Sequence, residues 1–384
     1  MQRTVFDADH EAFRQTVRAF IEKEVLPEYD TWLEKGAPRE LFRKLGDLGV
    51  MGFDIPEEYG GAGPTSFTYQ AVVLEEAGRA GVILGHFGVT AGIVLPYLLR
   101  LANANQRARW FPGIASGDIT FAIAMTEPGT GSDLAGIRTT ARRSEDGSHY
   151  VLNGAKTFIT GARNSELVVV VARTSPASSD DRRSGLSLLV VDTASEGFGF
   201  GRKLRKLGQQ AADTNELSFT DVHVPAENLL GEEGQGFSYL GQNLPRERLA
   251  IGVTTVAAAR AAIEQARAYT LERRVFDKPV AAFQNTKFVL AECATEVEAA
   301  TALLDRGLEL DERGELTGAD AAKIKLFCTE VAGRVIDKCL QLHGGYGYML
   351  EYPIARLYAD TRVTRIYGGT SEVMKTIIAK DLGL

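Results

Sequence analysis

The chain has 384 residues, 45% hydrophobic and 24% charged, which is the composition of a soluble globular protein with two or three domains. Its net charge of −7 argues against non-specific binding to nucleic acid or a membrane surface, and no apolar run reaches the roughly 18 residues of a membrane span. Three cysteines and five scattered histidines without metal-ligand spacing, and no signal-peptide core at the start, predict a cytoplasmic protein without a metal site.

The first third of the chain has helical periodicity. Apolar side chains at Phe13, Val17, Phe20 and Ile21 predict one helix, which Pro27 is expected to end. Further segments then follow in the order helix, loop and helix, at residues 39–50, 56–63 and 69–81.

Near residue 120 the pattern changes to that of strands. Asn153-Gly154 between two apolar runs predicts a hairpin, and three more apolar runs predict strands at 167–173, 185–192 and 215–224. The polar segment 174–185 is expected to be a surface loop. From about residue 230 the helical period returns, with one apolar stripe formed by Leu249, Val253, Val256 and Ile263.

This order of helices, strands and helices predicts an α+β fold with domains at 1–119, 120–229 and 230–384. Strands and helices do not alternate, which excludes a doubly wound dinucleotide-binding fold. The glycine-rich segment Glu127–Asp133 therefore fails as a Rossmann fingerprint, although its backbone amides could cradle an anion.

Five segments of the chain read AMTEPGTGSDLAG, KTFIT, ERRVFDKPVAAFQ, QLHGGYGY and YGGTSEV, at residues 124–136, 156–160, 272–284, 341–348 and 367–373. Together, and in this order, they resemble the acyl-CoA dehydrogenase family. The resemblance covers essentially the full chain. It implies an N-terminal α-helical domain, a middle β-barrel or sandwich domain and a C-terminal four-helix-bundle domain over the ranges given above.

The resemblance also implies that FAD is the cofactor, bound by two groups of residues. On the flavin-ring side they are Met125, Thr126, Ser132, Phe158, Ile159 and Thr160, where Phe158 stands in place of the Trp of many relatives. The pyrophosphate and adenosine would be bound across a subunit interface by Arg273, Phe276, Gln284, Gln341, Gly344 and Gly345. Thr370 and Glu372 complete the expected cofactor contacts. Asp277 departs from the family pattern, which usually has Gly after the Phe.

The catalytic base is the main question that the sequence raises. Many family members carry it in a Tyr-Glu-Gly-Thr segment, but Gly368 stands at the position of that Glu. The long-chain and isovaleryl types carry the base on a C-terminal-domain helix, and Glu247 in NLPRERL matches that position.

The residues around Glu247 alone also allow a plain surface carboxylate. Pro245 fits a helix start, and helical spacing places Glu247 opposite the Leu249/Val253 stripe, although Ile251 and Ala258 share its side. The absence of Glu at 368 combined with its presence at 247 favours the base.

The activity implied is α,β-dehydrogenation of an acyl-CoA thioester to a trans-2-enoyl-CoA, with electrons passed on to an electron-transfer flavoprotein. Glu247 would take the α-proton while the β-hydride moves to the flavin. The Gly368 backbone N–H and a flavin ribityl hydroxyl would donate to the thioester oxygen. Substrate contacts are expected from Ser132, Arg248 and Tyr367, and the assembly is expected to be a homotetramer.

Moving the base away from position 368 removes bulk from one wall of the cavity, which predicts acceptance of long or branched acyl chains. Three alternatives remain open: a flavin oxidase or monooxygenase on the same fold, an enoyl-CoA reductase, and a non-catalytic binding member of the kind that protects DNA. The net charge of −7 counts against the last.

Overall fold

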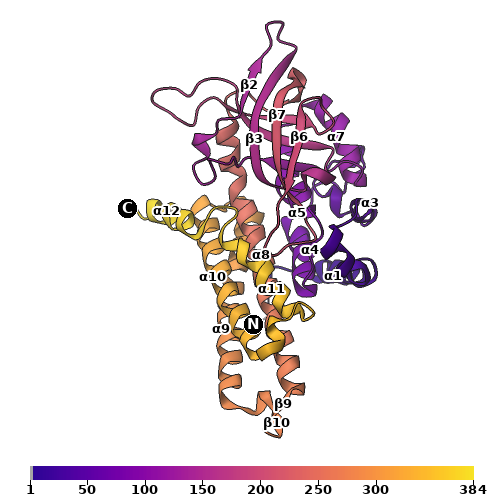
Figure 1. Ribbon diagram of the computed structural model, residues 1–384, viewed down its shortest axis with the longest axis vertical. Helices are drawn as coiled ribbons and strands as arrows, with labels where there is room; N and C mark the ends of the chain where they lie inside the picture. Colours follow the sequence, from indigo (N-terminus) through magenta and orange to yellow (C-terminus); the bar gives the residue numbers. More distant parts are fainter. Residues whose placement is uncertain (1–2) are drawn as a thin grey trace.

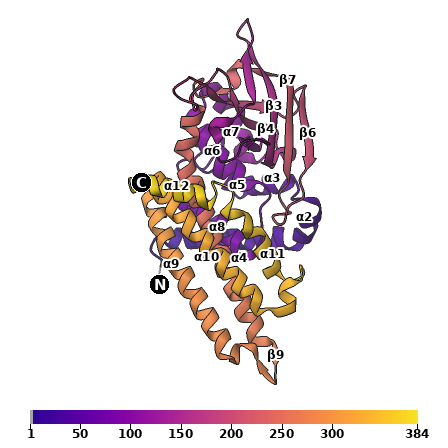
Figure 2. The same cartoon turned by 60° about the vertical axis from the view of Figure 1, so that its left-hand side comes forward.

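The computed structural model describes residues 3–384. The strands form one end of the molecule, the N-terminal helices lie along one side below them, and the long C-terminal helices run to the opposite end (Figure 1). Figure 2 shows the same division from a second direction, with β6 and β7 on the outer side of the sheet. The α+β fold with a helical, a β and a second helical region is confirmed.

The prediction that the first third of the chain is helical is confirmed, and residues 3–119 contain seven α-helices. They are α1 Ala8–Phe20, α2 Tyr29–Lys35, α3 Glu40–Asp47, α4 Phe67–Ala80, α5 Phe87–Val89, α6 Leu95–Leu101 and α7 Ala104–Ser116. The prediction that Pro27 ends the first helical stretch is wrong. The chain continues through a π turn, Ile21–Val25, and a 3-10 turn, Leu26–Glu28, into α2. Pro27 lies in the first turn of the 3-10 segment Leu26–Glu28, where a backbone N–H has no helical partner and is not needed.

The middle region forms one eight-stranded mixed sheet in the order β6-β7-β3-β2-β4-β5-β8, with β1 paired to β4. Its strands are β1 Phe121–Ala124, β2 Thr140–Arg143, β3 His149–Thr160, β4 Leu167–Arg173, β5 Leu186–Asp192, β6 Phe198–Lys203, β7 Thr214–Pro225 and β8 Leu229–Leu230. The continuous apolar run of β4 has a simple cause, since both of its faces are covered. Val169 and Val171 pack toward the N-terminal helices, whereas Val168 and Val170 pack into the second cluster of the sheet.

The predicted hairpin at Asn153-Gly154 is wrong, because both residues lie inside the long strand β3. The pairing of β3 with β7 shifts there by a bulge. The Asn153 amide bonds to Asp221 on β7, at 2.8 Å from its Nδ2 to the carboxylate. Gly154 has a φ of +150°, and a Cβ there would lie 2.5 Å from the Thr139 hydroxyl oxygen. Glycine is therefore needed at this position for a β-bulge and for the close contact with Thr139, and not for a turn.

The C-terminal region is built from long helices. These are α8 Gly236–Glu272, α9 Gln284–Glu312, α10 Gly318–Leu342, α11 Pro353–Thr361 and α12 Ser371–Asp381, with a small hairpin of β9 Arg274–Val275 and β10 Lys278–Pro279 after α8. The predicted stripe of α8 is confirmed, because Leu249, Val253 and Val256 pack in the core with α9 and α10. Pro245 does not start a helix. It lies inside α8, where its ring removes one backbone hydrogen bond.

Within residues 3–384, no helix is long and apolar enough to cross a lipid bilayer. The three cysteines are all free and buried.

A buried ion pair joins the loop after β1 to strand β3. Lys156 is fully buried and donates from Nζ to a Glu127 carboxylate oxygen and to the Met125 carbonyl, both at 2.9 Å. Glu127 also accepts the backbone N–H groups of Arg138 and Thr139, at 2.8 and 2.9 Å. The glycine-rich segment is therefore clamped at both of its ends by one carboxylate.

We expect Glu127→Gln to lower the free energy of unfolding by about 3–5 kcal/mol, because it leaves the buried Lys156 ammonium without a counter-charge. Urea denaturation at pH 7 measures the change. The control is Glu227→Gln, which breaks an exposed pair with Arg109 and should cost less than about 1 kcal/mol. Equal losses of unfolding free energy in the two variants would contradict a stabilising role of the Glu127–Lys156 pair.

Candidate active site

Glu247 lies in α8 where all three regions of the chain meet. Only 8% of the residue is exposed, and its carboxylate accepts a hydrogen bond from the hydroxyl of Tyr97 on α6, at 3.2 Å. Tyr97 is fully buried in a cluster that contains residues of the N-terminal helices, the sheet and the start of α8. The alternative of a surface carboxylate is therefore wrong, because the side of α8 opposite the Leu249 stripe is covered by other parts of the chain.

The electrostatic surroundings of Glu247 change its acidity. Burial raises the pKa of its carboxyl to about 7, against the opposing effects of the Tyr97 hydrogen bond and the Arg248 charge. A carboxylate with this pKa can accept a proton at neutral pH and still hold it firmly. This is the match to working pH that general-base catalysis requires.

Gly368 lies next to the same stretch of α8. A Cβ at Gly368 would be 2.5 Å from Cδ1 of Ile251, and the Arg248 Nε donates to the Gly368 carbonyl at 3.2 Å. Glu247 is the neighbour of Arg248 in the chain and lies one helical turn before Ile251, so it shares the face of α8 that meets Gly368. The structure thus brings together the two positions at which the sequence predicts catalysis.

The backbone of the double glycine has an unusual conformation. Gly368 and Gly369 have φ angles of +64° and +99°, a region that favours glycine. Among residues 3–384 the Gly368 N–H has no acceptor, which leaves it free for a ligand. Thr370 caps α12 by accepting the Val373 N–H.

The remaining residues predicted in this segment lie close by. Tyr367 precedes Gly368 and is 38% exposed, and Glu372 lies in the first turn of α12.

The two segments predicted to bind the flavin ring are adjacent. The Thr157 N–H donates to the Thr126 carbonyl at 2.9 Å, which places the loop after β1 alongside β3. Phe158 has a φ of +60° and a 67% exposed ring, so it offers an aromatic surface to a ligand. Ile159 is buried in the core of the sheet, so only its backbone can face a ligand. The other predicted residues of this group are at least partly exposed: Met125, Thr126, Ser132 and Thr160.

The second predicted group lies at the far end of α8. A cavity of about 500 Å³ is lined by Arg273, Gly344 and Gly345 together with His343, Tyr346 and Met349. Gln284 and Gln341 are exposed nearby in sequence, at the start of α9 and the end of α10. At a rise of 1.5 Å per residue, Arg273 is roughly 39 Å along α8 from Glu247. One chain therefore does not bring the two predicted cofactor groups together.

The structure explains why Asp277 can replace the Gly of the family pattern. Phe276 and Asp277 form the tip of the β9–β10 hairpin, with φ angles of +48° and +60°. Such a turn favours Gly, but Asp tolerates this conformation better than most residues. The Arg274 guanidinium donates to the Asp277 backbone carbonyl and so holds the turn. Phe276, 88% exposed, extends from the tip.

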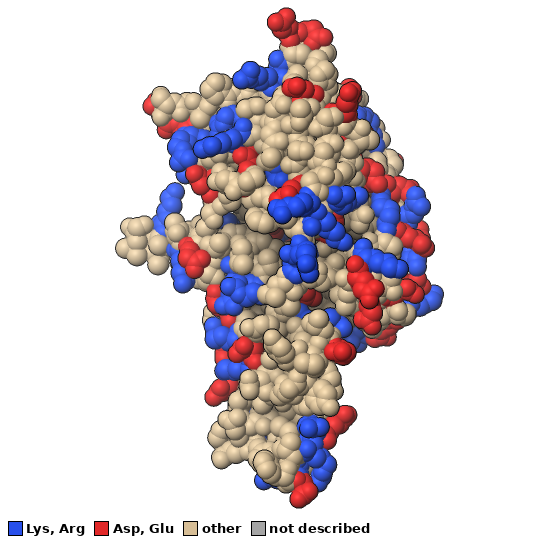
Figure 3. All heavy atoms as spheres, viewed as in Figure 1, with Lys and Arg blue, Asp and Glu red and all other residues tan. Residues whose placement is uncertain are grey.

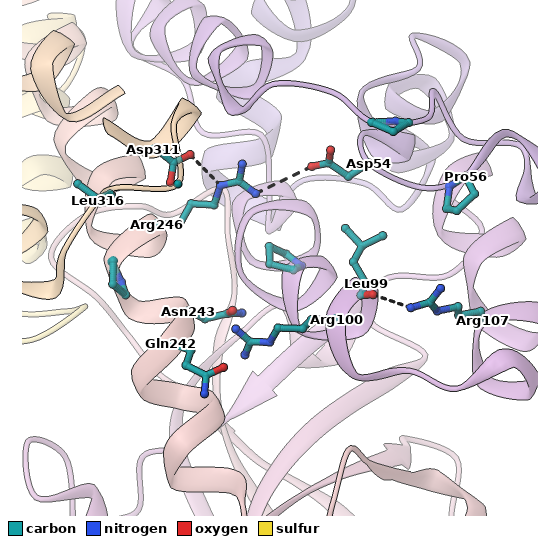
Figure 4. Close-up of a pocket in the computed structure, with 14 residues that line it drawn as sticks. Asp54, Pro56, Leu99, Arg100, Arg107, Gln242, Asn243, Arg246, Asp311 and Leu316 are labelled. Carbon is teal, nitrogen blue, oxygen red and sulfur yellow. Dashed lines mark hydrogen bonds and ion pairs between the residues drawn. The ribbon is translucent and has the colours of Figure 1, made fainter. Parts of the chain in front are cut away.

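A second cavity lies elsewhere on α8. Gln242 and Arg246, one turn apart, line a space of about 690 Å³ that Glu247 does not line (Figure 4). Arg246 bridges Asp311 of α9, at 3.3 Å, and Asp54 of the N-terminal region, at 4.0 Å. The Arg246 charge is paired with carboxylates from two regions, so this cavity lies where α8 meets α9 and the N-terminal region.

Two residues of the site were not predicted from the sequence. Tyr97 lies in an apolar segment, and the only indication of its role is that a buried tyrosine hydroxyl needs a hydrogen-bond partner. Lys325 of α10 donates from Nζ to the Gly369 carbonyl at 2.7 Å, although it lies 44 residues earlier in the chain. Among the described residues, no group of three or more His, Cys, Asp or Glu side chains could hold a metal ion.

Family models for the acyl-CoA dehydrogenase N-terminal, middle and C-terminal domains match residues 7–118, 122–222 and 234–383. The long-chain specific acyl-CoA dehydrogenase of Sus scrofa mitochondria is 42% identical over 99% of this chain and 88% of its own. A 3-(aryl)acrylate reductase of Clostridium sporogenes is 36% identical over 98% of this chain and 99% of its own.

Solved structures give the same assignment. An acyl-CoA dehydrogenase of Geobacillus kaustophilus superposes with a TM-score of 0.96, at 42% identity and over 100% of both chains. An acyl-CoA dehydrogenase of Bacillus anthracis, complexed with FAD, gives a TM-score of 0.90 at 33% identity, over 98% of this chain and 67% of its own. With matching models for all three domains and relatives along its whole length, the chain belongs to the acyl-CoA dehydrogenase family of oxidoreductases.

Proposed function

We propose that the protein is an FAD-dependent acyl-CoA dehydrogenase that converts an acyl-CoA thioester to its trans-2-enoyl-CoA, with Glu247 as the catalytic base. One observation carries the proposal. Glu247 is buried with its pKa raised to about 7, on the face of α8 that meets the free N–H of Gly368. A base and an oxyanion donor are the two groups that removal of an α-proton from a thioester requires.

The residues of the chain fit FAD as the cofactor. The exposed Phe158 ring and the partly exposed backbone around Thr126 offer a surface for a flat ring system. The Arg273 cavity offers a cation, and a Cβ at Gly344 or Gly345 would meet nothing within 4 Å, so a phosphate can approach the backbone. When bound, FAD would accept the hydride from the substrate β-carbon. Thr370 and Glu372 lie beside the Gly368 turn as further contacts.

In the proposed mechanism, the Gly368 N–H donates to the thioester oxygen while Glu247 takes the α-proton. A donor of this kind contributes about 2.7–4 kcal/mol, because it is aimed where negative charge develops. Tyr97 holds the carboxylate in place through its hydroxyl hydrogen bond. Arg248, Tyr367 and Ser132 are proposed to contact the substrate.

The acyl chain is expected to lie against the apolar cluster around Tyr97. Val89, Ile93 and Met125 are only partly buried and pack against this cluster. Long or branched acyl chains are proposed because no carboxylate side chain extends from position 368 into the site, where Ile251 packs against the glycine.

We propose a homotetramer in which a second copy completes each cofactor site, with an electron-transfer flavoprotein as the acceptor and the cytoplasm as the compartment. The exposed apolar surface at the far end of the long helices supports this proposed assembly. Figure 3 shows that much of this end carries no charged side chains, and Phe276, Tyr348 and Leu350 there are 88%, 84% and 69% exposed.

The reverse reaction, reduction of an enoyl thioester, is the second candidate. A pKa near 7 suits proton donation to the α-carbon as well as proton removal. One relative of similar length is named as a reductase. Anaerobic mixing separates the two directions, since a dehydrogenase bleaches its flavin with acyl-CoA and a reductase re-oxidises reduced flavin with enoyl-CoA. Oxygen consumption during turnover would identify an oxidase.

Glu247→Gln should lower the rate of flavin bleaching by about 10²–10⁴-fold, because a general base contributes that much and an amide cannot replace it. The measurement is anaerobic stopped-flow absorbance with a panel of straight and branched acyl-CoAs, which also gives the preferred chain. Glu264→Gln, on an exposed part of the same helix, is the matched control and should bleach like the wild type. Unchanged bleaching in Glu247→Gln would place the base elsewhere.

Tyr97→Phe should move the acidic limb of the kcat profile to higher pH. The Tyr97 hydroxyl lowers the pKa of Glu247, so its loss raises that pKa and reduces the carboxylate fraction near neutrality. Activity should fall at pH 6–7 and recover toward the wild-type value at alkaline pH. Tyr59→Phe, in the same apolar cluster, should leave the profile in place. A profile that Tyr97→Phe leaves unmoved would show that this bond does not tune the base.

Gly368→Glu restores the carboxylate of other family members but should reduce turnover at least about tenfold. A side chain there must adopt a positive φ and meet Ile251 Cδ1, which displaces the N–H donor. Steady-state kinetics on the FAD-loaded variant provide the test. A variant that is markedly faster than the wild type would contradict Glu247 as the base.

A further inference from the structure

Two cationic side chains from different helices tie down the turn that carries Gly368. Arg248 of α8 donates to the Gly368 carbonyl at 3.2 Å, and Lys325 of α10 donates to the Gly369 carbonyl at 2.7 Å. These two carbonyls are consecutive in the chain. Each glycine of the turn therefore has its carbonyl held by a separate positive charge.

Burial of Lys325 is energetically unfavourable and needs a reason. The residue is fully buried, and its only hydrogen-bond partner within residues 3–384 is the Gly369 carbonyl. Burial and the neighbouring Arg248 charge lower the pKa of Lys325 to about 8, while Glu330 and Glu372 act in the opposite direction. An apolar side chain of similar length would fill the space without the cost of desolvating an ammonium group.

The turn itself explains what the ammonium achieves. Gly368 and Gly369 have no side chains to restrict their backbone, and both have positive φ angles. The Tyr367 N–H upstream bonds to the Val363 carbonyl at 3.1 Å, and α12 begins directly downstream. With its carbonyls and both ends held, the turn keeps the Gly368 N–H in one direction.

We propose that Lys325 is a positioning residue for α-proton removal, which holds the Gly368–Gly369 turn, together with Arg248, so that the Gly368 N–H meets the thioester oxygen. The inference rests on the proposed function. It predicts that the loss of Lys325 harms stabilisation of the deprotonated substrate more than binding of the neutral one.

The test uses the FAD-loaded enzyme and its Lys325→Met, Lys325→Gln and Lys325→Arg variants. The probe is a 3-thiaacyl-CoA of the chain length that bleaches the wild type fastest. Sulfur at the β-position prevents hydride transfer, so Glu247 can take the α-proton but the reaction stops there. A long-wavelength absorbance band of the deprotonated probe against oxidised flavin, followed against pH, reports how strongly the site favours deprotonation.

In Lys325→Met, kcat should fall about 10–100-fold with KM changed less than about threefold, because the affected interaction belongs to the transition state. The band should appear only at higher pH than in the wild type, and Lys325→Arg should recover part of both losses. Lys323→Met, on the exposed side of α10, is the matched control and should behave like the wild type.

Each other outcome overturns the idea. A wild-type band in Lys325→Met, even with a lower kcat, would show that Lys325 acts only through general packing. Circular dichroism checks folding, and if Lys325→Met fails to fold, Lys325→Gln provides the same comparison. Absence of any band in the wild type would overturn the proposed function itself, which separates that failure from a failure of this inference.

Discussion

Keeping the Glu247 carboxyl out of water requires three parts of the chain to meet at one point. Tyr97 comes from the N-terminal helices and Glu247 from α8, and the surrounding cluster includes Phe121 and Val169 of the sheet. A carboxylate in such surroundings loses hydration, so its affinity for a proton rises. The chemistry of the site thus depends directly on domain packing, and a change that loosens the packing also weakens the base.

The two proposed catalytic groups come from different kinds of structure, the helix α8 and the Gly368–Gly369 turn. In the proposed mechanism the helix supplies the base, whose side chain is held by the Tyr97 hydroxyl, whereas the turn supplies only an N–H. Gly368 is confined to a conformation that favours glycine and contacts Ile251 where a side chain would begin. The missing carboxylate at this position is therefore a geometric requirement of an arrangement in which the base comes from α8.

Sequence patterns predict the order of the elements, the stripe of α8 and the residues that meet at the site. They fail where a residue has a role that only tertiary contacts define. Asn153-Gly154 has the composition of a turn but forms a bulge in β3. Its Asn153 side chain binds Asp221 on the paired strand β7, which is far away in the sequence. Pro245 resembles a helix start but lies within α8, where its ring removes one backbone hydrogen bond. Tyr97 and Lys325 carry no local signal, since each acts on a residue far away in the chain.

The length of α8 has a genetic consequence. Glu247 lies in the first half of this helix and Arg273 directly after its end, so in the proposed assembly each active site takes its base from one chain and its adenosine-side cavity from another. A chain defective only at Glu247 and a chain defective only at Arg273 would each be inactive alone. In a mixed dimer one site would inherit both defects and the other neither. Two loss-of-function alleles of this gene would then complement each other.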